Sequence, residues 1–148
     1  MKTYVLIVSR HFLSYHPKAG AETHFPEKIL SGEKLHTLRG NHQYWSKIIA
    51  KVNAGEAVLS VRYWSGKPYK STQVEIAQFT KLGEQKFTLH SFGTLAVDDK
   101  LHTLEKTTEI AKNDGLALQD FYDWFKLKKL PPNTQINGII IHFTNLKY

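Results

Sequence analysis

Hydrophobic and polar positions alternate in short blocks along the chain, and the first block predicts a strand over Tyr4 to Val8. Phe25 to Ser31 predicts a short helix, because Pro26 suits its first turn and Gly32 its end. The residues between, Arg10 to His24, are polar and irregular, which indicates a long surface loop. Loops of this length in a compact domain are often functional.

The middle of the chain has the clearest periodicity. Leu35 to Arg39 is expected to be extended, and Asn41 predicts the N-cap of a helix whose apolar residues recur at helical spacing up to Asn53. Ala57 to Trp64 and Thr72 to Leu82 are rich in β-forming residues and are joined by a turn sequence, residues 65–68. We therefore expect a strand, a helix and a β-hairpin.

The second half predicts strands around two helices. Strands are expected near Lys86 to Phe92 and at Ile136 to Phe143, with helices at Leu104 to Asn113 and Leu118 to Phe125 between them. Strands that flank helical regions favour a small barrel or curled sheet plugged by helices over a doubly wound parallel sheet. The expected class is α+β or mostly β.

Composition limits the organisation and the chemistry. With 148 residues and 41% hydrophobic content, the chain is expected to form a single domain over residues 1–148. The absence of cysteine rules out disulfides and thiolate metal sites and fits a cytoplasmic protein. The N-terminal apolar run is too short for a signal peptide or membrane span. No phosphate loop, nucleophile elbow or dinucleotide fingerprint is present, so no cofactor is expected.

The net charge of +7 is unevenly distributed. Residues 1–74 hold eleven Lys and Arg against four acidic residues, a surplus of seven, whereas residues 75–148 hold nine of each. A one-sided basic field suits a polyanionic partner such as RNA, since each neutralised phosphate releases counterions. A solvated surface that only keeps the protein in solution is the alternative.

One motif carries more information than the composition. Gly32 to Arg39 reads Gly-x-Lys-x-x-Thr-x-Arg after a helix that begins Phe-Pro-Glu-Lys, and this pattern resembles the signature of ASCH domains. Gly55 to Leu59 resembles the family's Gly-acid start of a strand. Ala111 to Gly115, followed by Phe121 to Phe125, resembles its Ala-x-x-acid-Gly and aromatic-helix block. The matches follow the family's order.

The resemblance implies a PUA-like small β-barrel with peripheral helices, in a superfamily that is largely RNA-associated. Its enzymatic members resemble amidohydrolases that remove the acyl group from N4-acylated cytidine with a Lys, a Thr and a Glu. By motif, the catalytic residues here are Lys34, Thr37 and Asp114. Asp114 replaces the family's glutamate and is shorter by one methylene.

The chemistry of these residues is coherent. A threonine hydroxyl is a poor nucleophile until a base takes its proton. Lys34 serves as that base if burial or a nearby cation such as Arg39 lowers its pKa from roughly 10.4. Asp114 then protonates the leaving amine or holds the lysine. Because Lys34 and Thr37 are three residues apart, both reach one pocket only if Lys34 lies in the turn after Gly32, before the strand.

Each of these residues also has a simpler interpretation. Lys34 and Arg39 could contact phosphates without catalysis, and Thr37 could be an ordinary strand residue. Asp114 could be a turn residue before a glycine, with no chemical role.

Further ligand contacts are expected around the motif and the hairpin. The candidate ligand- or phosphate-binding residues share a positive charge or an imidazole: Arg39, His36, Arg62, Lys67 and Lys70. At the hairpin these cations alternate with aromatic residues, on which bases could stack, although such rings often fill a core. The eight histidines lack compact ligand spacing, so no metal site is expected.

Two hypotheses follow. The protein is either a module that binds RNA or an RNA-derived nucleoside in a basic cleft, or an amidohydrolase acting on a modified nucleoside. An exposed Lys34 in an open basic groove favours the first, and a buried Lys34 with a shifted pKa in a closed pocket favours the second. The sequence does not indicate whether the loop Arg10 to His24 covers the cleft.

Overall fold

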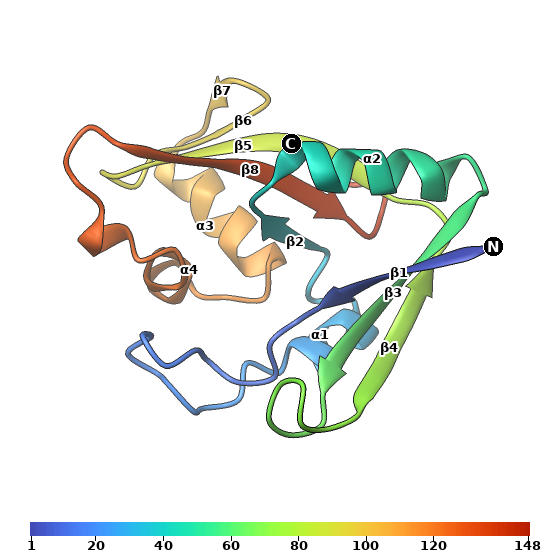
Figure 1. Ribbon diagram of the computed structural model, residues 1–148. Coiled ribbons are helices and arrows are strands. Elements are labelled where there is room, and N and C mark those ends of the chain that lie inside the picture. The colour runs from blue at the N-terminus through green and yellow to red at the C-terminus, as the bar shows by residue number, and fades with distance from the viewer.

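The protein forms two β-sheets with helices packed against them, in a computed structural model that describes all 148 residues (Figure 1). The strands are β1 Lys2–Ile7, β2 His36–Arg39, β3 Ala57–Trp64, β4 Gln73–Phe79, β5 Gly83–His90, β6 Leu95–Val97, β7 Lys100–Leu101 and β8 Gln135–His142. The helices are α1 Phe25–Ser31, α2 His42–Asn53, α3 Leu104–Asn113, α4 Leu118–Trp124 and the 3₁₀ helix η1 Leu127–Lys129.

The two sheets differ in strand direction. The smaller has the order β1-β3-β4, with β1 parallel to β3 and β4 antiparallel to it. The larger has the order β2-β8-β5-β6-β7 and is antiparallel throughout. A parallel pair needs a long crossover connection. Here the crossover between β1 and β3 carries α1, β2 and α2, so it delivers β2 to the other sheet.

The expected barrel is wrong, although the α+β content is present. The strands remain in separate sheets of three and five strands, and no pairing closes them into a barrel. The chain leaves the smaller sheet at Phe79 and enters the larger at Gly83. Between them, the Asn53 side chain accepts from Leu82 N at 2.8 Å and donates to Leu82 O at 2.9 Å. A side chain thus satisfies both backbone groups of Leu82 in the segment between the two sheets.

Most local predictions agree with the structure. The helices expected at Phe25 to Ser31 and up to Asn53 are α1 and α2, and the hairpin joins β3 to β4. The strand expected from Lys86 begins earlier, at Gly83, and the two shortest strands, β6 and β7, were not expected. None of the helices is both long enough and apolar enough to span a bilayer.

A single cluster of 23 buried hydrophobic residues joins the two sheets and the helices. Its fully enclosed members include Leu6, Leu59, Val61, Phe87, Leu89, Leu95, Ile110, Phe121, Ile139, Ile140 and Ile141. Burial of a large aliphatic or aromatic side chain stabilises a fold by about 1.5–3 kcal/mol. The cluster therefore fixes the ends of β1, β2 and α3, from which the site described below is built.

Candidate functional site

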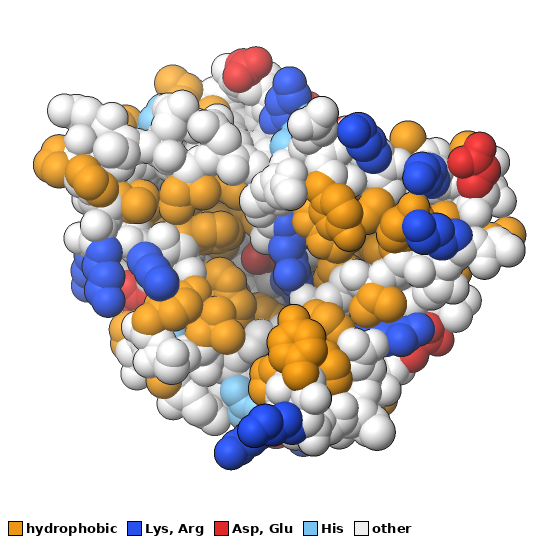
Figure 2. All heavy atoms as spheres, viewed as in Figure 1, with side chains coloured by type: hydrophobic (Ala, Val, Ile, Leu, Met, Phe, Trp, Pro, Cys, Tyr) orange, Lys and Arg blue, Asp and Glu red, His pale blue; other side chains and the backbone are white.

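A pocket of about 750 Å³ opens where segments from all parts of the chain meet. It is lined by the end of β1 and the following residues to Ser14, by β2, by the β3–β4 turn and by the end of α4. Ten of its twenty lining residues are hydrophobic, so its walls suit an apolar or aromatic ligand. On the face drawn in Figure 2, basic and acidic side chains lie in a central hollow with a largely hydrophobic rim.

Lys34 and Asp114 form a buried ion pair on the pocket lining. Lys34 is 3% exposed, and its Nζ donates to Asp114 O at 2.6 Å and to Oδ1 at 3.2 Å. The same Nζ lies 4.2 Å from the centre of the Phe25 ring. Burial lowers the pKa of Lys34, the charge and hydrogen bond of Asp114 oppose this shift, and the net direction is downward. A lysine in this setting loses its proton more readily than one in water.

Local backbone geometry brings this pair together. Gly32 ends α1 in the left-handed conformation, φ +82°, and Lys34 N then donates back to Lys28 O at 3.0 Å. Lys34 thus precedes β2, as the spacing from Thr37 requires if both are to line one pocket. Asp114 is the C-cap of α3. Gly115, at φ +88°, follows it, and a Cβ there would lie 3.2 Å from the Phe25 ring.

Thr37 and Arg39 come from β2 and also line the pocket. Their shared side of the strand follows from its two-residue period. Thr37 Oγ1 accepts a long hydrogen bond, 3.4 Å, from Arg39 Nε, and Arg39 Nη2 donates to Ile7 O at 2.6 Å. No hydrogen bond joins Lys34 to Thr37. The pocket therefore brings together Lys34, Thr37, Arg39 and Asp114, and the first two contact different partners.

His36 lies behind the pocket instead of lining it. It is fully buried, with Nδ1 3.1 Å from Asp114 Oδ1 and Nε2 2.6 Å from the Tyr148 hydroxyl. A carboxylate paired with Lys34 only accepts, so Nδ1 carries the proton and Nε2 accepts from Tyr148. Burial raises the pKa of Tyr148 to about 12, which keeps the hydroxyl protonated as a donor. His36 thus orients Asp114, and the sequence carried no signal that Tyr148 would complete this chain.

The basic residues expected at the hairpin lie apart from the pocket lining. Arg62 is occupied on β3, where Nε donates to Ser60 Oγ at 2.8 Å and Nη1 to Gln73 Oε1 at 3.0 Å. Lys67 and Lys70 are exposed in the β3–β4 turn. The pocket is lined instead by hydrophobic and small residues of this region, including Trp64 and Tyr69, whose ring centres are 5.1 Å apart.

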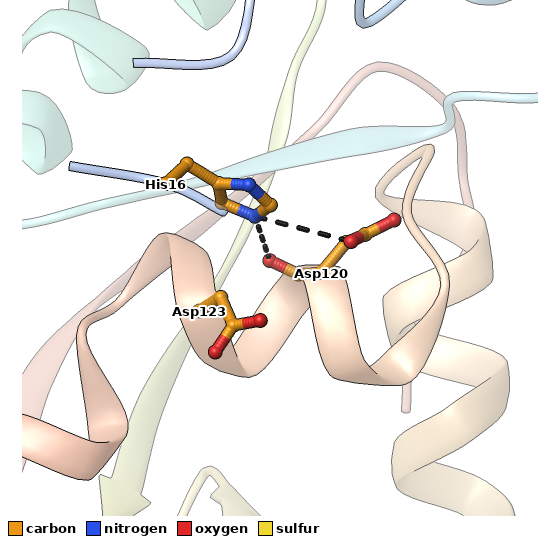
Figure 3. A group of neighbouring side chains, drawn as sticks. All are labelled: His16, Asp120 and Asp123. Atoms are coloured by element: carbon orange, nitrogen blue, oxygen red, sulfur yellow. Dashed lines mark hydrogen bonds and ion pairs between the residues drawn. The ribbon is translucent and has the colours of Figure 1, made fainter. Parts of the chain in front are cut away.

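Residues Arg10 to Ser14 of the Arg10 to His24 segment form one wall of the pocket, and the residues that follow are fastened to α4. The Tyr15 hydroxyl donates to Trp124 O at 2.6 Å, and Lys18 Nζ binds Asp120 Oδ2 at 2.7 Å. His16 is buried against the same helix, 3.1 Å from Asp120 O (Figure 3). The loop is therefore a fixed wall of the pocket.

His16, Asp120 and Asp123 are the one group with metal-like spacing, since a ligand atom of each lies within 4.8 Å of the others (Figure 3). Their hydrogen bonds explain the arrangement without an ion. His16 Nδ1 accepts from Lys18 N at 3.0 Å, so Nε2 carries the proton and donates to Asp120 O. Lys18 also neutralises the Asp120 carboxylate. These groups hold the loop against α4.

Comparisons of the chain with protein-family models, curated proteins and solved structures found no match. The interpretation of the site therefore depends on its geometry. A buried amine of lowered pKa, a hydroxyl, a guanidinium and a carboxylate face an aromatic pocket, a set able to bind a planar ligand and to catalyse proton transfer or acyl transfer on it.

Proposed function

We propose that the pocket binds an RNA-derived nucleoside and hydrolyses the amide of N4-acylated cytidine. The observation that carries this proposal is the burial of Lys34, with a lowered pKa, on the lining of a pocket rich in aromatic residues. An RNA-binding groove would place such a lysine in solvent, where it could reach phosphates. The resemblance of residues 32–39 to ASCH domains adds the assignment of Lys34, Thr37 and Asp114 as catalytic residues.

The pocket's size and walls support a nucleoside as the ligand. Small-molecule sites typically enclose about 300–1,000 Å³, and the volume of about 750 Å³ lies in this range. Aromatic residues from three segments, Phe25, Trp64 and Trp124, line it together with Tyr69. Such rings bind planar bases by stacking, and each stacked base contributes about 1–3 kcal/mol.

The proposed reaction uses water to convert the amide into a carboxylic acid and the free amine of cytidine. The Thr37 oxygen attacks the acyl carbon while neutral Lys34 takes its proton. The C–N bond then breaks, that proton passes to the leaving nitrogen, and water hydrolyses the threonine ester. Neutral Lys34 has two N–H groups, which Asp114 O and Oδ1 accept, and this leaves its lone pair free to act as the base.

Asp114 is assigned the task of holding Lys34. Its Oδ1 accepts from both Lys34 and His36, so this oxygen is already engaged. This supports the positioning alternative over direct protonation of the leaving amine. Lys34 and Thr37 share no hydrogen bond in the unliganded site, and catalytic hydrogen bonds commonly tighten only when substrate is bound.

Binding of RNA without catalysis is the second candidate. It is favoured by Lys67 and Lys70, which are exposed in the same turn as Tyr69, itself 89% exposed and lining the pocket. In this arrangement a base could stack on Tyr69 while the lysines contact phosphates. A cytoplasmic location, expected from the absence of cysteine, is part of both proposals.

Chromatography of N4-acetylcytidine incubated with the protein tests the proposed reaction. Free cytidine is expected, and Lys34→Met should slow its release by about 100-fold or more, because a general base contributes about 10²–10⁴ to the rate. Methionine keeps the pocket filled, and Lys47→Met, at an exposed position on α2, is the matched control with unchanged activity. An inert wild-type protein would rule out this substrate.

In that case an RNA titration at several salt concentrations tests the second candidate. The logarithm of the binding constant for single-stranded RNA should fall linearly with the logarithm of the salt concentration, with a slope of about −0.7 for each phosphate contact. Replacing Lys67 and Lys70 by alanine should remove about two such contacts from the slope.

A further inference from the structure

The pocket lining holds more positive than negative charge. Lys34 and Arg39 face one carboxylate, Asp114, whose Oδ1 is already bound by Lys34 and His36. No carboxylate lies within 4.0 Å of the Arg39 guanidinium, whereas Lys34 and His36 each have a hydrogen-bond partner in Asp114. Arg39 is partly buried, and a partly dehydrated guanidinium without an acidic partner favours an anionic ligand.

Arg39 also has N–H groups that donate to no other protein atom. A guanidinium carries five N–H groups, and the protein uses one on Ile7 O and one on Thr37 Oγ1. Three remain without a partner in a residue that lines the pocket. Thr37 Oγ1 accepts the bond from Arg39, so its own hydrogen is free to donate to a third group. Two neighbouring side chains thus offer donors to the same ligand.

Arg10, the other arginine on the pocket lining, differs from Arg39 in this respect. Its Nη2 lies 3.6 Å from Glu22 Oε1, and its guanidinium carbon lies 5.8 Å from the centre of the Tyr63 ring. The charge of Arg10 is therefore balanced locally, and Arg39 is the arginine of the pocket that lacks an acidic partner.

We propose that Arg39 and Thr37 form a binding site for a small oxyanion, a carboxylate or a phosphate, inside the pocket. The proposal deepens the proposed function and rests on it for the source of a carboxylate, which is the acid released from the acylated base. A phosphate would instead belong to a nucleotide. Both anions match the planar fork of a guanidinium, and charge-assisted hydrogen bonds of this type are roughly twice as strong as neutral ones.

Repulsion between the two positive charges of the site also favours binding of an anion. The positive charge of Arg39 contributes to the lowered pKa of Lys34, which means that the two cations repel each other. An anion bound between them would relieve the repulsion and would favour protonated Lys34. In the proposed reaction, the acid formed when water hydrolyses the Thr37 ester gives its proton to Lys34 and is held there as the carboxylate.

Nitrogen-15 NMR of the arginine Nε groups tests the proposal on the wild-type protein, with acetate and inorganic phosphate titrated separately at constant ionic strength. The chain has three arginines, and Arg62, which lies outside the pocket, is the internal reference. The Arg39 signal should shift and saturate with at least one of the anions while the Arg62 signal stays in place. Saturation by acetate indicates the released acid, and saturation by phosphate alone indicates a nucleotide.

Matched variants extend the test. Arg39→Lys keeps the charge but loses the fork, so the affinity should fall about ten-fold, whereas Arg62→Lys should leave it unchanged. In the wild-type protein, NMR shifts that do not saturate, or that are equal at Arg39 and Arg62, would overturn the proposal. Anion binding without release of cytidine would contradict the proposed hydrolysis and support the anion site. Release of cytidine without anion binding would support the hydrolysis and contradict the anion site.

Discussion

At the scale of single residues, the chain of hydrogen bonds behind the pocket connects Tyr148 to Lys34. Asn113 Nδ2 donates to the Tyr148 hydroxyl at 3.0 Å, and this hydroxyl, His36 and Asp114 continue the chain to the Lys34 amine. Loss of any link leaves a buried polar group without a partner, which typically costs about 1–3 kcal/mol. The outermost link is separated from the substrate, so it acts only through Asp114.

Tyr148→Phe should therefore change the pH dependence of the reaction. Without its Tyr148 partner, His36 binds Asp114 less firmly, the carboxylate attracts the Lys34 proton more strongly, and the pKa of Lys34 rises. Because the reaction needs neutral Lys34, the rate increases with pH through this pKa, and its rise should move to higher pH in the variant. The measurement is the pH profile of kcat/KM for release of cytidine.

Tyr122→Phe is the control for this experiment. It removes another partly buried hydroxyl, which donates to Gly93 O at 2.8 Å and lies outside the pocket lining. Its pH profile should match the wild type. An unchanged profile in Tyr148→Phe, with activity otherwise retained, would contradict the positioning role of Tyr148.

The sequence predicted this site in part. Motif spacing singled out Lys34, Thr37, Arg39 and Asp114, which the structure places on one pocket. His36 was expected to bind ligand, whereas it contacts Asp114, and this contact depends on where α3 ends. Tyr148 is a single aromatic residue beyond the last strand, and no local pattern relates it to residues more than one hundred positions earlier.

At the scale of elements, β2 and β8 approach each other more closely than a side chain at Gly138 would allow. A Cβ at this position would overlap Arg39 O and would lie 2.6 Å from the Phe87 ring. Gly138 is therefore required by packing in the strand that supports β2, and β2 carries Thr37 and Arg39.

Gly138→Ala should lower the free energy of unfolding by about 1–3 kcal/mol, because the overlap forces the strands or the Phe87 ring to move. Urea unfolding at pH 7 measures the change. Gly40→Ala is the matched control, since no atom lies within 4 Å of a Cβ there, and its effect should stay within about 0.5 kcal/mol. Equal stability of the two variants would show that the β2–β8 contact is more adaptable than the structure indicates.

Element prediction succeeded where periodicity was long and failed where pairing was decided at a distance. The twelve residues of α2 present a continuous apolar face, whereas β6 and β7 have three and two residues, too few to show a period. The predicted barrel required strand edges to pair, and a pattern of alternating side chains does not specify neighbours. In the structure, β1 pairs in parallel with β3 and the two sheets stay separate.

At the scale of the whole molecule, His142 couples stability to pH. It is fully buried, its Nε2 donates to Gln85 Oε1 at 3.0 Å, and its Nδ1 has no partner. Burial lowers its pKa to about 3, with smaller contributions from His36 and Lys147 that Asp98 opposes. The unfolded chain takes up this proton near the usual value of about 6.5, so the unfolded state binds more protons at acidic pH.

The protein should therefore lose stability as the pH falls from about 6.5 toward 3, by up to about 1.4 kcal/mol per pH unit from this residue. Urea unfolding between pH 7 and pH 4 measures the slope. His142→Gln retains a donor for Gln85 and should reduce the slope, whereas His11→Gln, at an exposed position, should not. Identical slopes in His142→Gln and the wild type would exclude His142 as the source.

The ion pair between Lys34 and Asp114 joins positions eighty residues apart, and its consequence concerns the order of folding. Contacts between distant parts of a chain form late, because the closure of a long loop costs entropy before the contact compensates for it. Each helix and hairpin is able to form from neighbouring residues, but the pocket is completed only when α1 and α3 have docked. Partly folded chains therefore lack the site altogether, and any ligand of the pocket selects the fully folded molecule.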